Sequence, residues 1–317
     1  MKESLASTTI LGKDHTGGVP TALTLDLLRL QGEAMTLGQR AKIVGRFSPA
    51  EQIDIHQEYA TAQAVFWKKW TVFRCSQAGE GDPNFGDVQK VLGVNRYFAR
   101  EIVNPEAGAF IVDLGGGSGT VPASFTKQQR EGLAGCAIID NNDLLAEKAE
   151  QRLKRMSIAN SRFINHDLAD GSLPEKLSEI ISAAKPSHVV VTTNWSLYFL
   201  DAPTRTLFRS CLDPKVIGGR PSRLVANCIT VGKFDREKLK QGFIKHLPSY
   251  LARFPKTTFR AIQALKQMEQ FADELTETTI LRTAGEFETL MREAGLTIAA
   301  VNPTLLWGQS TAITAVK

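Results

Sequence analysis

The segment FIVDLGGGSGTV, residues 110–121, combines one carboxylate with four closely spaced glycines. Asp113 ends an apolar run, and the glycines begin two residues later. A glycine-rich turn between a strand and a helix lets the main chain approach a ligand closely and presents amide N–H groups at the helix N-terminus. The segment therefore predicts a ligand-binding turn rather than a plain connection.

The spacing of the glycines discriminates between classes of ligand. A phosphate-binding P-loop requires Gly-Lys-Ser/Thr, and this segment contains no lysine. A dinucleotide turn requires a third glycine three residues after the second, where this chain has Thr120 or Pro122. The spacing that fits is acid-x-Gly-x-Gly-x-Gly, in which the acid is Asp113. A carboxylate there would repel a pyrophosphate, whereas it suits a ligand that carries an ammonium and a sulfonium group.

Seven short apolar runs supply the strands that would position this turn. They comprise residues 109–114, 135–140, 161–167, 187–194, 222–231, 297–306 and 310–317. Helical patterns at 119–132, 142–156, 174–184 and 203–211 separate the first five runs, and a helix at 284–294 precedes the last two. Strands that alternate with helices indicate βαβ units and a doubly wound, mostly parallel α/β sheet. The last two runs flank a short turn near Gly308 and predict a C-terminal antiparallel hairpin.

The rest of the chain predicts helical additions to this sheet. Residues 1–104 have mostly helical patterns, and a capping box at Ser48 and Glu51 opens a helix that reaches about residue 74. Residues 232–283 are also helical in pattern. We expect a cap or dimerisation region at 1–104, and an α/β domain at 105–317 that contains a helical lid insertion at 233–282.

The acid–glycine pattern resembles that of the Rossmann-like, class I S-adenosylmethionine-dependent methyltransferases, and the likeness covers about residues 105–317. Asp140 ends the second predicted strand, 21 residues after Gly119, where an acid accepts hydrogen bonds from both ribose hydroxyls. Asp167 ends the third, where the family often holds the adenine amino group. The closing helix and hairpin of the chain also resemble those of the family. The resemblance implies S-adenosylmethionine as cofactor, S-adenosylhomocysteine as product, and no metal.

The resemblance further implies a set of cofactor-binding residues. Asp113 would orient the methionine ammonium, the glycine turn would hold the methionine and ribose, and Asp140 would bind the ribose. The full set is Asp113, Gly115, Gly116, Gly117, Gly119, Asp140, Asn141, His166, Asp167, Leu168, Asn194 and Trp195. Two assignments have alternatives: Asp140 as a helix N-cap, a role open to Asn141 or Asn142, and adenine recognition by the backbone of Leu168 or Ala169 instead of Asp167.

The segment NWSLYF, residues 194–199, bears on whether a general base is used. Plant-type small-molecule O-methyltransferases have Trp-x-x-His-Asp here, with the histidine as base. Alignment on Trp195 puts Tyr198 in the place of that histidine, so Tyr198, His166 and His246 are the candidate bases. Methyl transfer requires a base only when the nucleophile must lose a proton, so amine or carbon methylation stays open. Trp195 and Tyr198 either line the pocket or pack in the core.

Composition limits which classes of partner and which cellular compartment are expected. The net charge is +5 and 43% of the residues are hydrophobic, as in an ordinary soluble protein. The basic stretch at 233–266 is more typical of a solvated helical face than of an RNA-contacting surface. Cys136 and Cys228 stand in apolar runs and predict buried free thiols. Because no apolar run is long enough to span a bilayer and the N-terminus lacks a secretion signal, we expect a cytoplasmic protein.

These observations predict a methyltransferase that acts on an O, N or C nucleophile of a small molecule enclosed under a helical cap. A homodimer through the N-terminal helices is expected, and nucleic-acid and membrane partners are not. One alternative is an RNA or protein methyltransferase, although the chain has TTNWSL where many base-amino methyltransferases have Asn/Asp-Pro-Pro-Tyr/Phe. The other is a protein of the same fold that binds the cofactor without transferring a methyl group.

Overall fold

The computed structural model describes residues 93–168, 170–196, 201–229, 235–253, 255, 258, 282–305 and 308–317. Their strands form one seven-stranded sheet in the order β3-β2-β1-β4-β5-β7-β6. The strands are β1 Ala109–Leu114, β2 Gly135–Asp140, β3 Ser161–Asn165, β4 His188–Asn194, β5 Ser222–Ile229, β6 Thr297–Leu305 and β7 Ser310–Val316. Strands β1 to β5 are parallel, and β7 runs antiparallel to both β5 and β6. The predicted mostly parallel sheet with a C-terminal antiparallel hairpin is confirmed.

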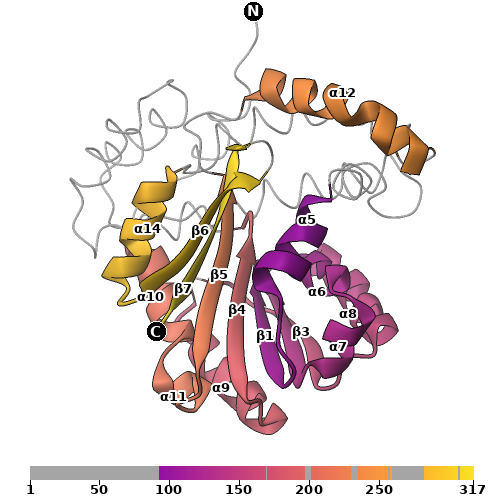
Figure 1. The fold of residues 1–317 in the computed structure, drawn as a ribbon. Coiled ribbons are helices and arrows are strands. Elements are labelled where there is room, and N and C mark those ends of the chain that lie inside the picture. The colour runs from indigo at the N-terminus through magenta and orange to yellow at the C-terminus, as the bar shows by residue number, and fades with distance from the viewer. Residues whose placement is uncertain are drawn as a thin grey trace, which may run out of the picture.

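Helices cover both faces of the sheet, as a doubly wound fold requires (Figure 1). They are α5 Val94–Tyr97, the π-helix η1 Phe98–Val103, α6 Thr120–Ser124, α7 Lys127–Gly132, α8 Asp143–Met156, α9 Leu173–Ala184, α10 Asp201–Cys211, α11 Pro214–Ile217, α12 Arg236–Arg253 and α14 Ala284–Glu293. The chain winds from β1 outward to β3 and then returns to β4, which pairs with β1 on its other side. The strand order reverses between β1 and β4, and open α/β sheets bind ligands at such a switch point.

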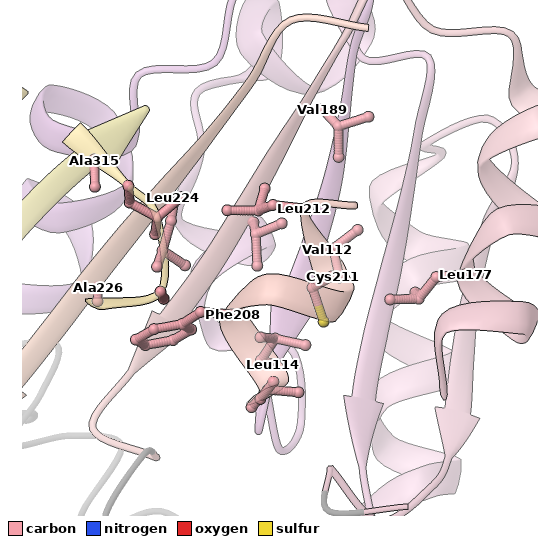
Figure 2. Packing of buried hydrophobic residues seen from close by; sticks show 14 of the residues in the cluster. Val112, Leu114, Leu177, Val189, Phe208, Cys211, Leu212, Leu224, Ala226 and Ala315 are labelled. Carbon is pink, nitrogen blue, oxygen red and sulfur yellow. The ribbon is translucent and has the colours of Figure 1, made fainter. Parts of the chain in front are cut away.

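Alternation along β1 divides the core into two layers. Ala109 and Ile111 pack with η1, α6 and α8, whereas Phe110, Val112 and Leu114 pack with α9, α10, α11 and α14. Figure 2 shows the second layer, in which Phe208 and Leu212 lie against strand residues such as Leu224. Because both faces of the central strands are covered, β1 and β4 carry continuous apolar runs, 109–112 and 189–191, rather than alternating apolar and polar residues.

The prediction of a single helix over 119–132 is wrong, because this segment forms two helices. α6 ends at Ser124 and α7 begins at Lys127. Thr126 accepts a hydrogen bond from the backbone N–H of Gln129, and the Gln129 side chain accepts one from the backbone N–H of Thr126. This reciprocal capping box starts a new helix in the middle of the predicted one. The buried Phe125 ring anchors the break in the core.

Two elements lie beyond the carboxyl ends of the parallel strands. Figure 1 shows α5 and α12 on that side of the sheet. α12 is the part of the predicted lid insertion at 233–282 that the structure describes as a helix. The helices predicted at 21–45 and 48–74 lie outside the described residues, so the domain boundaries stay predictions. None of the described helices has the length and apolar character needed to cross a bilayer.

Candidate functional site

The glycine turn follows β1 at the switch point, and its backbone conformation depends on glycine. Gly115, Gly117 and Gly119 have φ angles of 61°, 53° and 74°. L-residues rarely adopt this left-handed region, because the Cβ then crowds the backbone. Gly119 is the N-cap of α6, so the turn ends where the helical N–H groups begin. The turn is closed by a hydrogen bond from the backbone N–H of Gly119 to the carbonyl of Gly116, 2.9 Å long.

Two of the glycines are also required by close packing. A Cβ at Gly115 would stand 2.4 Å from Cβ of Ser196, the second residue after β4. A Cβ at Gly116 would stand 2.5 Å from Oδ2 of Asp113. The glycine backbone therefore lies directly on the β4 loop on one side and over the Asp113 carboxylate on the other.

Asp113 is a buried acid with one carboxylate oxygen unsatisfied. Its side chain points to the same face as Ile111, and Oδ1 accepts a 2.8 Å hydrogen bond from the hydroxyl of Thr192. Oδ2 is buried and has no hydrogen-bond partner in the structure. Burial is the main cause that raises the pKa of Asp113 to about 7; the hydrogen bond from Thr192 opposes the rise, and the nearby Asp140 carboxylate adds to it. A buried, half-satisfied acid is costly to the fold and typical of a functional site.

Asp140 ends β2 and connects the glycine turn to the next loop. Its Oδ2 accepts a 2.8 Å hydrogen bond from the backbone N–H of Gly117, and Oδ1 accepts a 2.9 Å bond from the backbone N–H of Asn142. Burial raises the pKa of Asp140, and these two N–H groups oppose the rise. Each carboxylate oxygen can accept more than one hydrogen bond, so both keep capacity for a ligand hydroxyl. Asn142 is the N-cap of α8, which leaves Asp140 free of that role.

Asp140→Ala should weaken binding of S-adenosylmethionine by about tenfold or more, since it removes the acceptor for the ribose and the bond that orients Gly117. Isothermal calorimetry at constant pH measures the effect. Asp143→Ala serves as the matched control, because it removes an exposed acid three residues away in the first turn of α8. An Asp140→Ala protein that binds the cofactor as tightly as the control would refute the ribose assignment.

A chain of polar side chains joins the carboxyl ends of β4 and β5 to neighbouring elements. Asn194 donates a 2.8 Å hydrogen bond to Oδ1 of Asn95 in α5 and accepts a 2.7 Å bond from Nδ2 of Asn227 in β5. Ser310, the first residue of β7, donates to Oδ1 of Asn227 and accepts a 3.0 Å bond from the Trp195 indole. These bonds fix the orientation of each amide on the edge of the sheet that carries the glycine turn.

Trp195 has a strained backbone at this position. Its φ angle is 57°, which is rare for a bulky residue and costs of the order of 1–3 kcal/mol. A 2.9 Å hydrogen bond from its backbone N–H to the carbonyl of Asn227 holds the strained conformation. The ring is partly buried and packs against the core layer that contains η1 and α6. Trp195 therefore belongs to the core in part, as one of the two sequence interpretations held, and it also lies beside the switch point.

The third predicted loop lies on the opposite side of the glycine turn, after β3. The His166 ring is buried, its Nδ1 lies 3.1 Å from Nζ of Lys176, and its Nε2 lies 3.7 Å from a carboxylate oxygen of Asp170. Asp167 and Leu168 follow it and are half-buried. Asn141, by contrast, is exposed next to Asp140. The structure thus brings the predicted cofactor residues to one edge, over strands β3, β2, β1 and β4.

The two candidate bases that the structure describes, His166 and His246, lie on different elements. Strands β2 and β1 separate His166, at the end of β3, from Asn194 at the end of β4. His246 is exposed on α12, with its ring 6.0 Å from that of Tyr250. Tyr198 lies outside the described residues. None of the three assignments is tested by this arrangement, and each stays a prediction.

Sequence reasoning missed several residues that shape the site. Thr192 binds Asp113, and Ser196 donates a 2.8 Å hydrogen bond to the carbonyl of Leu114. Arg152 of α8 donates to both oxygens of Ser118 within the glycine turn. The polar ending of the apolar run VVVTTN was a signal for Thr192, and Asn227 within VANCI was a comparable one. No sequence signal distinguishes Arg152 from the other basic residues of its helix.

The buried cysteines show no sign of taking part in a site. Cys136 and Cys228 are free and buried, as predicted, and so is Cys211. Burial raises the pKa of Cys211 and of Cys228 to about 12, so both are inert thiols at neutral pH. Among the described residues, no three side chains of the metal-ligating types lie close enough together to hold a metal ion.

Comparison with known proteins gives similarity of fold only. No family model and no curated protein matches the sequence. Similar solved structures include an S-adenosylmethionine-dependent methyltransferase from Leishmania major, at 13% identity and a TM-score of 0.47, with 82% of this chain and 83% of that one covered. Mitomycin 7-O-methyltransferase MmcR is 15% identical with a TM-score of 0.42, and the match covers 87% of this chain and 75% of that one. The pyocyanin biosynthetic protein PhzM is 13% identical with a TM-score of 0.43, and the match covers 71% of this chain but only 54% of PhzM.

The fold class itself follows from the strand order and the antiparallel β7, not from these low similarities. It is the Rossmann-like fold of class I S-adenosylmethionine-dependent methyltransferases.

Proposed function

We propose that the protein is an S-adenosylmethionine-dependent methyltransferase that acts on a small molecule. The observation that carries the proposal is the unsatisfied Oδ2 of Asp113 beneath Gly116, beside a glycine turn that Asp140 holds in place. A cationic ligand at this edge would compensate the two neighbouring carboxylates, whereas a pyrophosphate would be repelled by them.

The residues present fit this cofactor. Asp113 would attract its ammonium group, the backbone N–H groups of the turn would bind its methionine portion, and Asp140 would accept hydrogen bonds from the ribose hydroxyls. The cofactor supplies an electrophilic methyl group on a sulfonium. The chain contributes mainly alignment, because an in-line displacement with a neutral leaving group needs no acid, and alignment alone can contribute roughly 7–11 kcal/mol.

The proposal of a small-molecule substrate rests on the segments that stand over the site. α5 is bonded to the end of β4 through Asn95 and Asn194, and α12 begins beside the hairpin turn at Gln309. Elements that cross the carboxyl edge favour an enclosed substrate over a polymer. Methylation of RNA or protein, and a non-methylating use of the same fold, are the alternatives. A cytoplasmic location and a homodimer through residues 1–104 are part of the proposal.

Two measurements test the function. In calorimetry, S-adenosylmethionine should bind, while NADH and ATP should neither bind nor compete. In the second, the protein is incubated with methyl-labelled S-adenosylmethionine and a metabolite extract, with total RNA in a parallel sample. Formation of S-adenosylhomocysteine with label in a small molecule supports the proposal, and label in RNA supports the first alternative. Cofactor binding without formation of any methylated product would support the non-methylating alternative instead.

A further inference from the structure

Six buried side-chain polar atoms of the described residues have no hydrogen-bond partner. They are Asp113 Oδ2, His166 Nε2, His188 Nε2, Arg223 Nε, Thr258 Oγ1 and Gln309 Nε2. His188 and Arg223 lie at the starts of their strands, away from the site. Asp113 and His166 lie at the carboxyl edge and belong to the cofactor site already described. Gln309, which precedes β7, lies at the same edge but outside the cofactor site.

Gln309 occupies a junction of three elements. It is fully buried, and its Oε1 accepts a 2.6 Å hydrogen bond from the backbone N–H of Asp235. Asp235 in turn accepts a bond from the backbone N–H of Lys238 and so caps the start of α12. The next residue, Ser310, pairs with Ile229 at the end of β5. The amide therefore lies between the hairpin turn, the end of β5 and the beginning of the helix that crosses the edge.

The hydrogen bond from Asp235 also settles which atom of the amide is unsatisfied. A backbone N–H can only donate, so the amide atom that it meets must be the oxygen. The other atom is then the –NH₂ group, a double donor that is buried and has no acceptor in the structure. A buried donor left without an acceptor destabilises the folded protein, and an oxygen atom of a ligand would remove this cost.

The surroundings favour an oxygen acceptor over a cation. The ammonium of Lys238 lies 3.7 Å from the position that a Cβ on the neighbouring Gly308 would take. A positive charge there opposes an amine and favours a carbonyl or carboxylate oxygen. The side chain of Ser310, the other neighbour of Gln309, is already bonded to Asn227, so it does not compete for the Gln309 amide.

We propose that Gln309 is a specificity-determining residue of the substrate site, and that its Nε2 group binds a carbonyl or carboxylate oxygen of the substrate. The inference rests on the proposed function, which puts a substrate at the carboxyl edge of the sheet. At this edge, β5 separates β7 from β4. Two strand spacings correspond to about 10 Å. A substrate that binds Gln309 and also reaches the end of β4 beside the switch point must therefore extend roughly 10 Å, which excludes substrates of only a few heavy atoms.

The test observes the Gln309 side chain directly and does not depend on turnover. Protein labelled with ¹⁵N-glutamine gives side-chain amide signals, and the Gln309 pair is the one lost in Gln309→Glu and Gln309→Met. Benzamide, benzoate and benzylamine are the probes, titrated with and without saturating S-adenosylhomocysteine. We expect benzamide or benzoate to shift the Gln309 signals in a saturable way and benzylamine to leave them in place. The stronger of the two oxygen probes identifies a carbonyl or a carboxylate as the preferred group.

The variants separate recognition from support of α12. Gln309→Glu keeps the oxygen that accepts from Asp235 and replaces the donor, so it should lose about tenfold or more in affinity for the oxygen probe while cofactor affinity stays unchanged. Gln309→Met loses both. The inference is overturned if neither oxygen probe moves the Gln309 signals, or if Gln309→Glu binds the probe as the unmodified protein does. Failure of the proposed function would instead appear as absent S-adenosylmethionine binding in the unmodified protein.

Discussion

Asp113→Asn is expected to stabilise the ligand-free protein at pH 8 by about 2–4 kcal/mol and to abolish tight binding of S-adenosylmethionine. The stabilisation arises because the folded protein holds the carboxyl proton until the pKa of about 7, whereas the unfolded chain loses it near the ordinary pKa of 3.8. The folded state binds more protons between these values, so the acid lowers the free energy of unfolding as the pH rises from about 4 to 7. The asparagine variant lacks this dependence.

Denaturant unfolding at several pH values measures the difference between the two proteins. The difference should be small near pH 4, grow up to about pH 7 and level off above it. Asp143→Asn, which changes an exposed acid, should show no such trend. If Asp113→Asn is less stable than the unmodified protein at pH 8, Asp113 is a structural residue and its unsatisfied oxygen is not kept available for a ligand.

Cofactor affinity should follow the same ionisation in the opposite sense. The ammonium group requires the ionised acid, so affinity should fall by about tenfold at pH 6 relative to pH 8, where Asp113 is ionised. The affinity for 5′-methylthioadenosine, which lacks the ammonium group, should vary much less over this range. An equal pH dependence for the two ligands would show that Asp113 does not act on the ammonium.

Gly115→Ala should be among the most damaging single-methyl substitutions in the described part of the chain. It places a Cβ 2.4 Å from Ser196 and adds a side chain at a φ of 61°. The backbone term costs about 1–2 kcal/mol and the overpacking a further 1–3 kcal/mol. Because Ser196 follows β4, the collision also separates the glycine turn from the β4 loop, and binding of S-adenosylmethionine should be lost.

Gly219→Ala is the matched control for this substitution. Gly219 has a φ of 67°, close to that of Gly115, but a Cβ there would meet no atom within 4 Å. It should lose only the backbone term and keep full cofactor affinity. Thermal unfolding and calorimetry of both variants distinguish the collision from the strain. Equal losses of stability and cofactor affinity in the two variants would show that Ser196 moves aside at little cost. The close approach of the two loops would then not be needed for cofactor binding.

Local sequence rules predicted the elements well, because each rule depends on neighbours in the chain. The continuous apolar runs gave buried parallel strands, as seen for β1 and β4. The turn at Gly308 gave the hairpin of β6 and β7, and Asn142 rather than Asp140 caps α8. The one clear error, the helix over 119–132, came from overlooking a capping box that is itself local: Thr126 and Gln129 stand three residues apart within the predicted helix.

The sequence by itself determined the acid–glycine turn, the acid at Asp140 and the alternation of strands and helices, since these follow from residue type and spacing along the chain. Only the tertiary structure decided that β7 inserts between β5 and β6, that Thr192 satisfies one oxygen of Asp113 and leaves the other unsatisfied, and that Gln309 reaches the start of α12. The physical reason is that these features join residues separated by about 70 positions or more. Which distant partner a polar group meets, and which it lacks, depends on how the strands are ordered in space.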